Sequence, residues 1–270
     1  MIRTWSRGAA DEHMGEEILV RTGDGVRRHP WWAARARLTL ALLRRRGIRP
    51  PARVLDAGCG WGVTLEALEA AGYDATGLDV SPRILARLDH PGRKLIEADL
   101  CQIEAGVRDA EAYDAVLALD VIEHLDDDRA AVAALGSLVE PGGVVVVSVP
   151  AQPSLFSEFD AIQGHRRRYT PERLRQAFDG SGLAVDSAFW WGAWMTPILR
   201  RRLGREKGRP GDEPAEVYLR HLRLPPWPGP AMLRAAYALE HPLALRGWLP
   251  TGTSLFAIAK RADRRLREPL

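Results

Sequence analysis

Cysteine is scarce in this sequence, which contains only Cys59 and Cys101 among its 270 residues. Two cysteines cannot build a disulfide framework or a zinc site with four cysteine ligands. This scarcity favours a reducing, cytoplasmic setting, because disulfide-dependent folds belong to oxidising compartments. We predict no metal site from the sequence.

A long hydrophobic run is also missing. The longest mostly apolar stretch, 188–199, has twelve residues and is followed by three arginines, whereas a helix that crosses a bilayer needs about 20. Acidic residues, Asp11, Glu12, Glu16 and Glu17, occupy the first 20 positions, where a secretory signal requires an apolar segment. We therefore expect neither secretion nor a membrane span.

Lysine is nearly absent: the sequence contains three lysines and 35 arginines. The formal net charge is only +3 and the isoelectric point is about 9.1. Proteins dedicated to nucleic acids usually concentrate basic residues on one face. This small excess predicts that nucleic acid is not a partner.

What the sequence does contain is a regular alternation of short apolar strands with helices. The predicted strands are 53–57, 74–80, 94–98, 113–119, 144–149, 183–190 and 254–259. The predicted helices are 31–46, 63–71, one that begins at Pro82, 126–139, 171–178 and 232–245, the last interrupted near Pro242. Strands that are apolar on both faces and separated by helices indicate an α/β fold with a parallel sheet covered on both sides. Residues 1–30 are polar and are expected to form a loose segment.

A glycine-rich turn follows the first predicted strand of this alternation. Gly58, Gly60 and Gly62 alternate with Cys59 and Trp61 between a strand and a helix. Glycine allows a sharp bend and a close approach of a ligand to the backbone, and the N–H groups at a helix start attract anionic or polar ligands. The spacing differs from the Gly-x-Gly-x-x-Gly fingerprint of dinucleotide-binding folds, which argues against an NAD(P)-dependent oxidoreductase.

Three acidic residues accompany the first three strands. Asp56 lies inside the first, Asp79 ends the second and Asp99 follows the third. An acid at the end of the second strand can accept both hydroxyls of a ribose. Because open α/β sheets bind ligands at the carboxyl edge of their strands, the three carboxylates are expected to converge on one site.

These motifs resemble those of the class I S-adenosylmethionine-dependent methyltransferases. The segments that carry the resemblance are VLDAGCGWG at 54–62, GLDVS at 77–81, EADL at 97–100, LDVIEHL at 119–125 and EPGG at 140–143. The fourth is similar to a motif of the small-molecule branch that contains ubiquinone-type O-methyltransferases. The resemblance implies a Rossmann-like, doubly wound, seven-stranded sheet, mostly parallel with an antiparallel last strand, and S-adenosylmethionine as cofactor.

The same resemblance implies roles for individual residues. The methionine part of the cofactor would contact Gly58, Cys59, Gly60, Gly62, Asp120 and Val121, with Asp56 reaching its amino group. The ribose would bind Asp79, and the adenine would lie against Val80, Asp99 and Leu100.

The acceptor side is expected at two further places. His124 follows the fourth strand, and His165 belongs to the segment 164–169, GHRRRY, which is similar to the Gly-His-x-Arg-Arg-Tyr signature of one subgroup of the family. We predict both histidines as catalytic residues, with His165 as general base near neutral pH. We predict Arg167, Arg168 and Tyr169, together with Trp31 of an N-terminal lid helix, as substrate-binding residues. A purely structural role for these residues is also open. In that interpretation the arginines form a salt-bridged loop, and Tyr169, Trp31 and His124 are packing residues.

The chain divides into four predicted parts. They are an N-terminal segment with the lid helix at 1–50, the cofactor-binding core at 51–190, a helical C-terminal insertion or acceptor-side lobe at 191–250, and the last strand with a charged tail at 251–270. Aromatic residues at 189–194 precede arginines 200–202, a combination that suits a membrane interface. Burial of these aromatics in the core or in an acceptor pocket is the favoured interpretation.

The predicted function is methyl transfer from S-adenosylmethionine to a small-molecule acceptor, at oxygen. Two alternatives remain open: methylation of a lipid or saccharide intermediate of the cell envelope, and a regulatory module that binds the cofactor without catalysis. The displacement itself demands an in-line approach and exclusion of water more than any particular side chain. Nothing in the sequence defines the oligomeric state.

Overall fold

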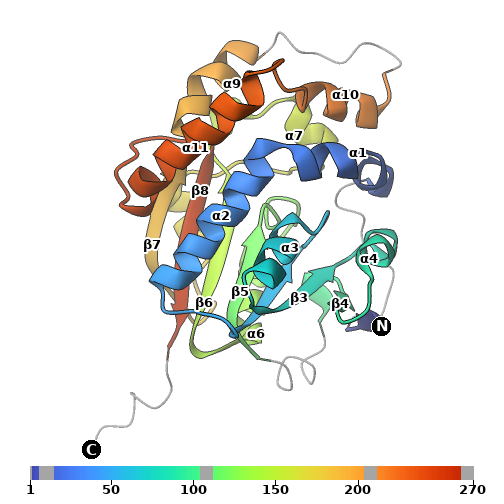
Figure 1. Ribbon diagram of the computed structural model, residues 1–270. Helices are drawn as coiled ribbons and strands as arrows, with labels where there is room; N and C mark the ends of the chain where they lie inside the picture. The colour runs from blue at the N-terminus through green and yellow to red at the C-terminus, as the bar shows by residue number, and fades with distance from the viewer. Residues whose placement is uncertain (1, 6–14, 104–111, 204–211, 263–270) are drawn as a thin grey trace, which may run out of the picture.

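The fold is organised around one eight-stranded sheet in a computed structural model of the chain (Figure 1). The structure describes residues 2–5, 15–103, 112–203 and 212–262. In spatial order the strands are β1 (Ile2–Thr4), β4 (Lys94–Glu97), β3 (Asp74–Asp79), β2 (Arg53–Ala57), β5 (Tyr113–Leu119), β6 (Val139–Pro150), β8 (Ser254–Arg261) and β7 (Leu183–Trp191). The order reverses direction between β2 and β5, which is the point where open α/β sheets bind ligands.

All seven predicted strands are present, and β8 is antiparallel to both of its neighbours. The predicted count of seven is wrong by one, because the short strand β1 adds to the outer edge by pairing in parallel with β4. A three-residue strand has no periodicity that could be recognised in the sequence, and its pairing depends on a tertiary neighbour.

Helices cover both faces of the sheet, with α2 and α3 in front and α6 behind in Figure 1. The helices are α1 (Glu16–Arg28), α2 (Pro30–Arg45), α3 (Val63–Ala70), α4 (Pro82–Leu88), α6 (Asp128–Leu138), α7 (Glu158–Ile162), α8 (Pro171–Gln176), α9 (Thr196–Arg202), α10 (Pro214–His221) and α11 (Gly229–Leu245). The Ser81 hydroxyl caps α4 by accepting from the Ile84 N–H at 3.2 Å, and Thr170 caps α8 in the same way, as Ser-Pro and Thr-Pro pairs predict.

Each face of the sheet has its own hydrophobic core. Buried side chains of α6 and α8 pack on one face, and those of α2, α3 and α4 pack on the other. The valines of β6 alternate between the two cores, with Val145 in the first and Val146 in the second. Burial on both faces explains why this strand lacks any alternation of polar and apolar residues.

The prediction of a loose segment at 1–30 is wrong for the described residues. Besides β1, the segment forms α1, whose buried face is made by Ile18, Leu19 and Val26. Acidic residues begin this helix and Arg27 and Arg28 end it, which suits the helix dipole. The Trp61 indole donates to the Leu19 carbonyl at 2.8 Å and thereby ties α1 to the glycine-rich turn.

The C-terminal helix α11 also differs from its prediction, because it begins at Gly229 and continues through Pro242 to Leu245. Its buried residues are few, and Met232, Leu239 and Leu243 are exposed. Within the described part of the chain, we find no helix with the length and apolar character required to cross a membrane. The helices α7, α9 and α10 lie beyond one end of the sheet, at the top of Figure 1.

Candidate functional site

A cavity of about 900 Å³ lies at the carboxyl edge of the strands. Its floor includes the ends of β2, β3 and β5, and residues of α1, α7, α10 and α11 complete its walls. Ten of the eleven residues predicted to bind the cofactor line this space: Asp56, Gly58, Cys59, Gly60, Asp79, Val80, Asp99, Leu100, Asp120 and Val121. The volume lies in the range typical of sites for small molecules.

The glycine-rich turn requires glycine for two different reasons. Gly58, Gly60 and Gly62 all have positive φ angles, of 72°, 47° and 77°, a region that other residues rarely occupy. A Cβ atom at Gly58 would lie 2.5 Å from Cγ2 of Val121, on the wall of the cavity. Gly62 is not among the lining residues, and a Cβ there would lie 2.7 Å from Leu88. The structure thus places Gly62 behind the turn, where it allows α3 to pack against α4.

Three carboxylates converge on the cavity as the sequence predicts, in different environments. The oxygens of Asp79 accept the Gly60 and Ser81 N–H groups at 2.8 and 3.0 Å, while burial raises the pKa of the group. Asp99 accepts from the Cys101 N–H at 2.9 Å and from the Gln102 amide at 2.8 Å. Burial raises the pKa of Asp56 to about 7, and the positive charge of Arg35 only partly opposes this effect.

Asp120 is held in an unusual backbone conformation at the end of β5. Its φ angle of 58° is left-handed, which costs energy for any residue other than glycine. An ion pair with Arg35 and a hydrogen bond from the Ser148 hydroxyl at 3.2 Å hold the carboxylate. Arg35 also lies over the Trp31 ring, 4.8 Å from its centroid. Helix α2 therefore positions a cation directly beside the cavity.

The two predicted catalytic histidines lie together on the cavity wall. The rings of His124 and His165 are 4.7 Å apart and nearly perpendicular, and both residues line the cavity. The His165 Nδ1 lies 3.0 Å from Oδ1 of the buried Asp160. Burial opposes ionisation of Asp160, but the hydrogen bond from His165 and the charge of Arg168 outweigh it and lower its pKa to about 2. Asp160 is therefore an anion that accepts the Nδ1 proton of His165.

The structure places only two of the four residues predicted to bind the acceptor at the cavity. Arg167 donates to the Leu125 and Asp126 carbonyls at 2.7 and 3.1 Å. The Tyr169 hydroxyl donates to Asp128 at 2.9 Å from a fully buried position. Neither residue lines the cavity, so the geometry assigns both to holding the turn after β5.

Trp31 and Arg168 do line the cavity. Trp31 packs against the rings of Trp32 and Trp191. Arg168 directs Nε and Nη2 at the two oxygens of Asp160, at 2.8 and 3.1 Å. This pairing leaves Arg168 little capacity for an anionic acceptor.

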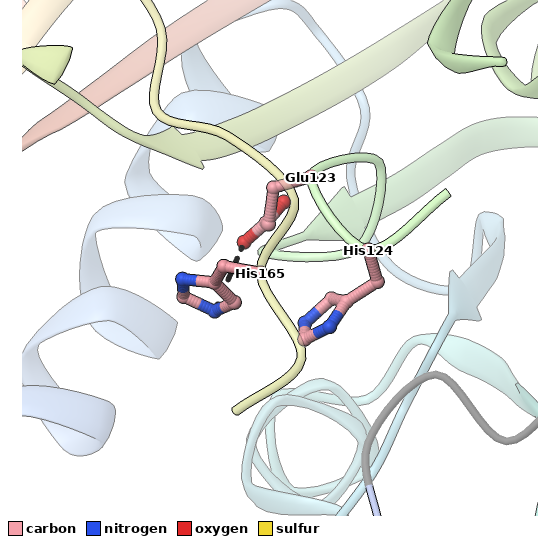
Figure 2. Close-up of side chains that lie close together, drawn as sticks. All are labelled: Glu123, His124 and His165. Carbon is pink, nitrogen blue, oxygen red and sulfur yellow. Dashed lines mark ion pairs between the residues drawn. The ribbon is translucent and has the colours of Figure 1, made fainter. Parts of the chain in front are cut away.

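Two buried acids at this site were not predicted from the sequence. Figure 2 shows Glu123 beside His124 and His165, with its carboxylate directed at the His165 ring. The other is Asp160, which accepts from the Ser157 N–H and hydroxyl as well as from His165 and Arg168. The spacing of Ser157 and Asp160 is that of a capping box, a signal that indicates a helix start and not an active site.

Comparisons with known proteins agree with this geometry. A family model described as a methyltransferase domain matches residues 31–188. A ubiquinone biosynthesis O-methyltransferase from Aromatoleum aromaticum is 39% identical over 100 residues, which cover 36% of this chain and 43% of that protein. The chain thus matches less than half the length of this curated relative.

Solved structures share the fold at low sequence identity. An S-adenosylmethionine-dependent methyltransferase from Archaeoglobus fulgidus superposes with a TM-score of 0.51, 20% identity and coverage of 83% of this chain and 94% of the other. A phosphoethanolamine N-methyltransferase from Haemonchus contortus, solved with S-adenosyl-L-methionine, gives a TM-score of 0.51 at 18% identity, covering 83% of this chain and 52% of that one. At these identities the likeness concerns the fold alone.

The raised pKa of Asp56 makes the stability of the unliganded protein depend on pH. The unfolded carboxyl ionises near its ordinary value of 3.8, whereas the folded one stays protonated until about 7. The folded state therefore loses stability as pH rises from about 4 to 7, by about 4 kcal/mol for a shift of this size. We expect Asp56→Asn to remove this loss, so that its advantage over the wild type in urea unfolding grows across that range. A difference in unfolding free energy that stays constant from pH 4 to pH 8 would contradict this assignment.

Proposed function

Because the chain belongs to the family of methyltransferase domains, we propose that it transfers the methyl group of S-adenosylmethionine to an oxygen atom of a small-molecule acceptor. The observation that carries the proposal is the cavity into which the glycine-rich turn and the carboxylates Asp56, Asp79 and Asp99 all face. The similarity to ubiquinone biosynthesis O-methyltransferases supports oxygen as the acceptor atom.

The residues around the cavity fit this cofactor. Each oxygen of Asp79 accepts one backbone N–H and has a second lone pair for a ribose hydroxyl. Asp56, buried at the end of β2, would ionise on meeting the cofactor's amino group and pair with it. Asp99 and Leu100 would flank the adenine, and Val80 would lie against it. Gly58 keeps the turn clear of a Cβ that would collide with Val121.

The cofactor, when bound, supplies a methyl group on a positively charged sulfur. The protein's own contribution is to orient the acceptor, exclude water and remove a proton from the acceptor hydroxyl. We assign proton removal to His165. In the neutral ring, donation from Nδ1 to Asp160 would leave Nε2 as the nitrogen with a lone pair to accept the proton. His124 packs edge-on against this ring and would restrict where the acceptor oxygen lies.

We also propose roles for the flanking parts of the chain. Residues 1–50 would close the cavity from one side, through Leu19 of α1 and Trp31 of α2. Residues 191–250 would form the acceptor-side lobe around the core at 51–190, and β8 within 251–262 would complete the sheet. The rest of the predicted charged tail, 263–270, lies outside the described residues. A cytoplasmic location suits the reduced cysteines, Cys59 and Cys101.

Thermal unfolding with separate additions of S-adenosylmethionine, S-adenosylhomocysteine, NAD and NADP tests the cofactor. We expect the midpoint to rise with the two adenosyl compounds alone, because a ligand at 100 times its Kd stabilises the folded state by about 2.7 kcal/mol. Asp79→Ala should raise the Kd by about 100-fold or more, since it removes two charge-assisted hydrogen bonds. Asp186→Ala, an exposed carboxylate on β7, is the control. A shift with NAD or NADP, or none at all, would refute the proposal.

Substitution of His165 tests its proposed role. With a panel of small molecules that carry hydroxyl groups as acceptors and release of S-adenosylhomocysteine as the readout, His165→Asn should lower kcat by about 10²–10⁴-fold, the range of a lost acid–base group. Its affinity for S-adenosylmethionine should stay unchanged. The matched control is His90→Asn, an exposed histidine on another loop. Unchanged kcat at saturating acceptor would remove His165 from the mechanism, and no turnover by the wild type would favour a non-catalytic module.

A second candidate function is favoured by the acceptor side of the cavity. Its wall toward α9 and α11 is apolar and includes Trp194, Met195 and Leu199. The outer face of α11 exposes Met232, Leu239 and Leu243, with Trp248 just beyond the helix. Arginines 200–202 end the adjacent α9. An apolar and basic surface of this kind suits an anionic membrane, and the acceptor would then be a lipid-like intermediate of the cell envelope.

Flotation with lipid vesicles tests the second candidate. We expect binding to vesicles that contain phosphatidylglycerol and little binding to pure phosphatidylcholine. The double variant Leu239→Ser/Leu243→Ser should reduce binding by about tenfold or more, since burial of each exposed leucine contributes about 1.5–3 kcal/mol. Its unfolding midpoint should hardly change, because neither side chain is buried. Absence of binding to either vesicle would leave the small-molecule acceptor as the proposal.

A further inference from the structure

The hydroxyl of Tyr218, on α10, has no hydrogen-bond partner among the residues that the structure describes. The side chain is fully buried and yet borders the cavity. Burial raises the pKa of this phenol above its ordinary value, so the hydroxyl keeps its proton at neutral pH and is available as a donor. A buried polar group without a partner is costly to the folded state, which indicates that this donor serves a ligand.

Aromatic packing holds the Tyr218 ring in place. The ring contacts Trp61 of the glycine-rich turn, with centroids 6.2 Å apart, and Phe159 of α7, with centroids 5.0 Å apart. Helix α10 packs against both α1 and α7 (Figure 1), and buried side chains of α1, α2 and α10 form one hydrophobic cluster. The fold therefore sets the position of the hydroxyl before any ligand binds, which lowers the entropic cost of a bond to it.

Two charged residues identify the part of the cavity that this hydroxyl borders. Besides burial, the positive charge of Arg35 lowers the pKa of Tyr218 and the negative charge of Asp120 raises it. The charge of Arg35 also lowers the pKa of Asp56, and all four side chains line the cavity. Within the described part of the chain, Nε of Arg35 is buried without an acceptor. A cation beside an unpartnered hydroxyl donor suits an anionic group.

The methionine part of S-adenosylmethionine carries such an anion. In the function proposed above, on which this inference rests, its amino group pairs with Asp56. Its carboxylate is attached to the same carbon atom and must lie close by, and the charge of Arg35 reaches both Asp56 and Tyr218. We propose that the Tyr218 hydroxyl donates a hydrogen bond to this carboxylate, so that α10 contributes a cofactor-binding residue. A hydrogen bond to a charged acceptor is among the stronger kinds in proteins.

This assignment extends the cofactor site beyond the matched methyltransferase domain. The family model ends at residue 188, whereas Tyr218 belongs to the helical part of the chain that follows β7. An ion pair between Arg21 of α1 and Glu213, the residue before α10, joins these two helices. A cofactor bonded to Tyr218 therefore links the sheet to α10 and, through it, to α1. We expect substitution in α10 to change the affinity for the cofactor.

Calorimetric titration of the full chain tests the assignment without any turnover. The two ligands are S-adenosylhomocysteine and S-adenosyl-3-thiopropylamine, which differs from it only in lacking the carboxylate. We expect Tyr218→Phe to weaken binding of S-adenosylhomocysteine by about 10- to 100-fold, the range of a lost hydrogen bond to a charged group. Its affinity for the decarboxylated compound should equal that of the wild type. The matched control is Tyr237→Phe, which removes a hydroxyl bonded to Met195 elsewhere on the cavity and should change neither affinity.

Thermal unfolding of the unliganded protein separates ligand binding from a structural role. Tyr218→Phe keeps the ring and removes an unpartnered buried hydroxyl, so its midpoint should equal or exceed that of the wild type. A lowered midpoint together with weaker binding of both compounds would reveal a packing role and overturn the assignment. Unchanged affinity for S-adenosylhomocysteine would overturn it too, while leaving the proposed function intact. Failure of the wild type to bind S-adenosylhomocysteine would refute the proposed function and this inference together.

Discussion

The hydrogen bonding of Asp160 is the constraint on which the histidine-bearing wall of the cavity depends. Its two oxygens accept from the His165 ring, from two nitrogens of Arg168 and from both the N–H and the hydroxyl of Ser157. A single buried anion thus joins the start of α7 to the loop that follows it. Because charged acceptors make the strongest hydrogen bonds and lose most when buried unpaired, this loop has one favourable arrangement, and that arrangement sets the position of His165.

The two buried carboxyls beside the His165 ring therefore have pKa values shifted in opposite directions. Asp160 is saturated with donors and keeps a low pKa, whereas Glu123 accepts no hydrogen bond from the residues that the structure describes and its pKa is raised by burial. Pairs of acids whose environments push their pKa values apart are a recurrent feature of active sites. The His165 ring lies between them, bonded to the first and facing the second. One acid fixes the imidazole, and the other faces the opposite ring nitrogen.

The sequence predicted well which strand ends line the cavity, because local patterns determine the strands. Strand β5 has the predicted bounds, 113–119, and the acids at the strand ends converge because parallel strands end at one edge. The acceptor side was predicted less well, since the partners there come from distant segments. Nothing near Arg167 indicates that its donors reach the carbonyls of residues 125 and 126. Likewise, Glu123 lies in a recognised motif, but its environment depends on the fold of residues 157–169.

The division between the two sides has a functional consequence. The curated relative matches only 36% of this chain, and the family model ends at residue 188, before α9, α10 and α11. The same sheet can serve many acceptors, because function resides in the groups placed at its edge. In this chain the groups that line the cavity include residues of α1, near the N-terminus, and apolar residues of α9 and α11. If the proposed function holds, acceptor choice would depend on these segments outside the matched region, whereas His124 and His165 lie within it and would face any acceptor that the outer helices admit.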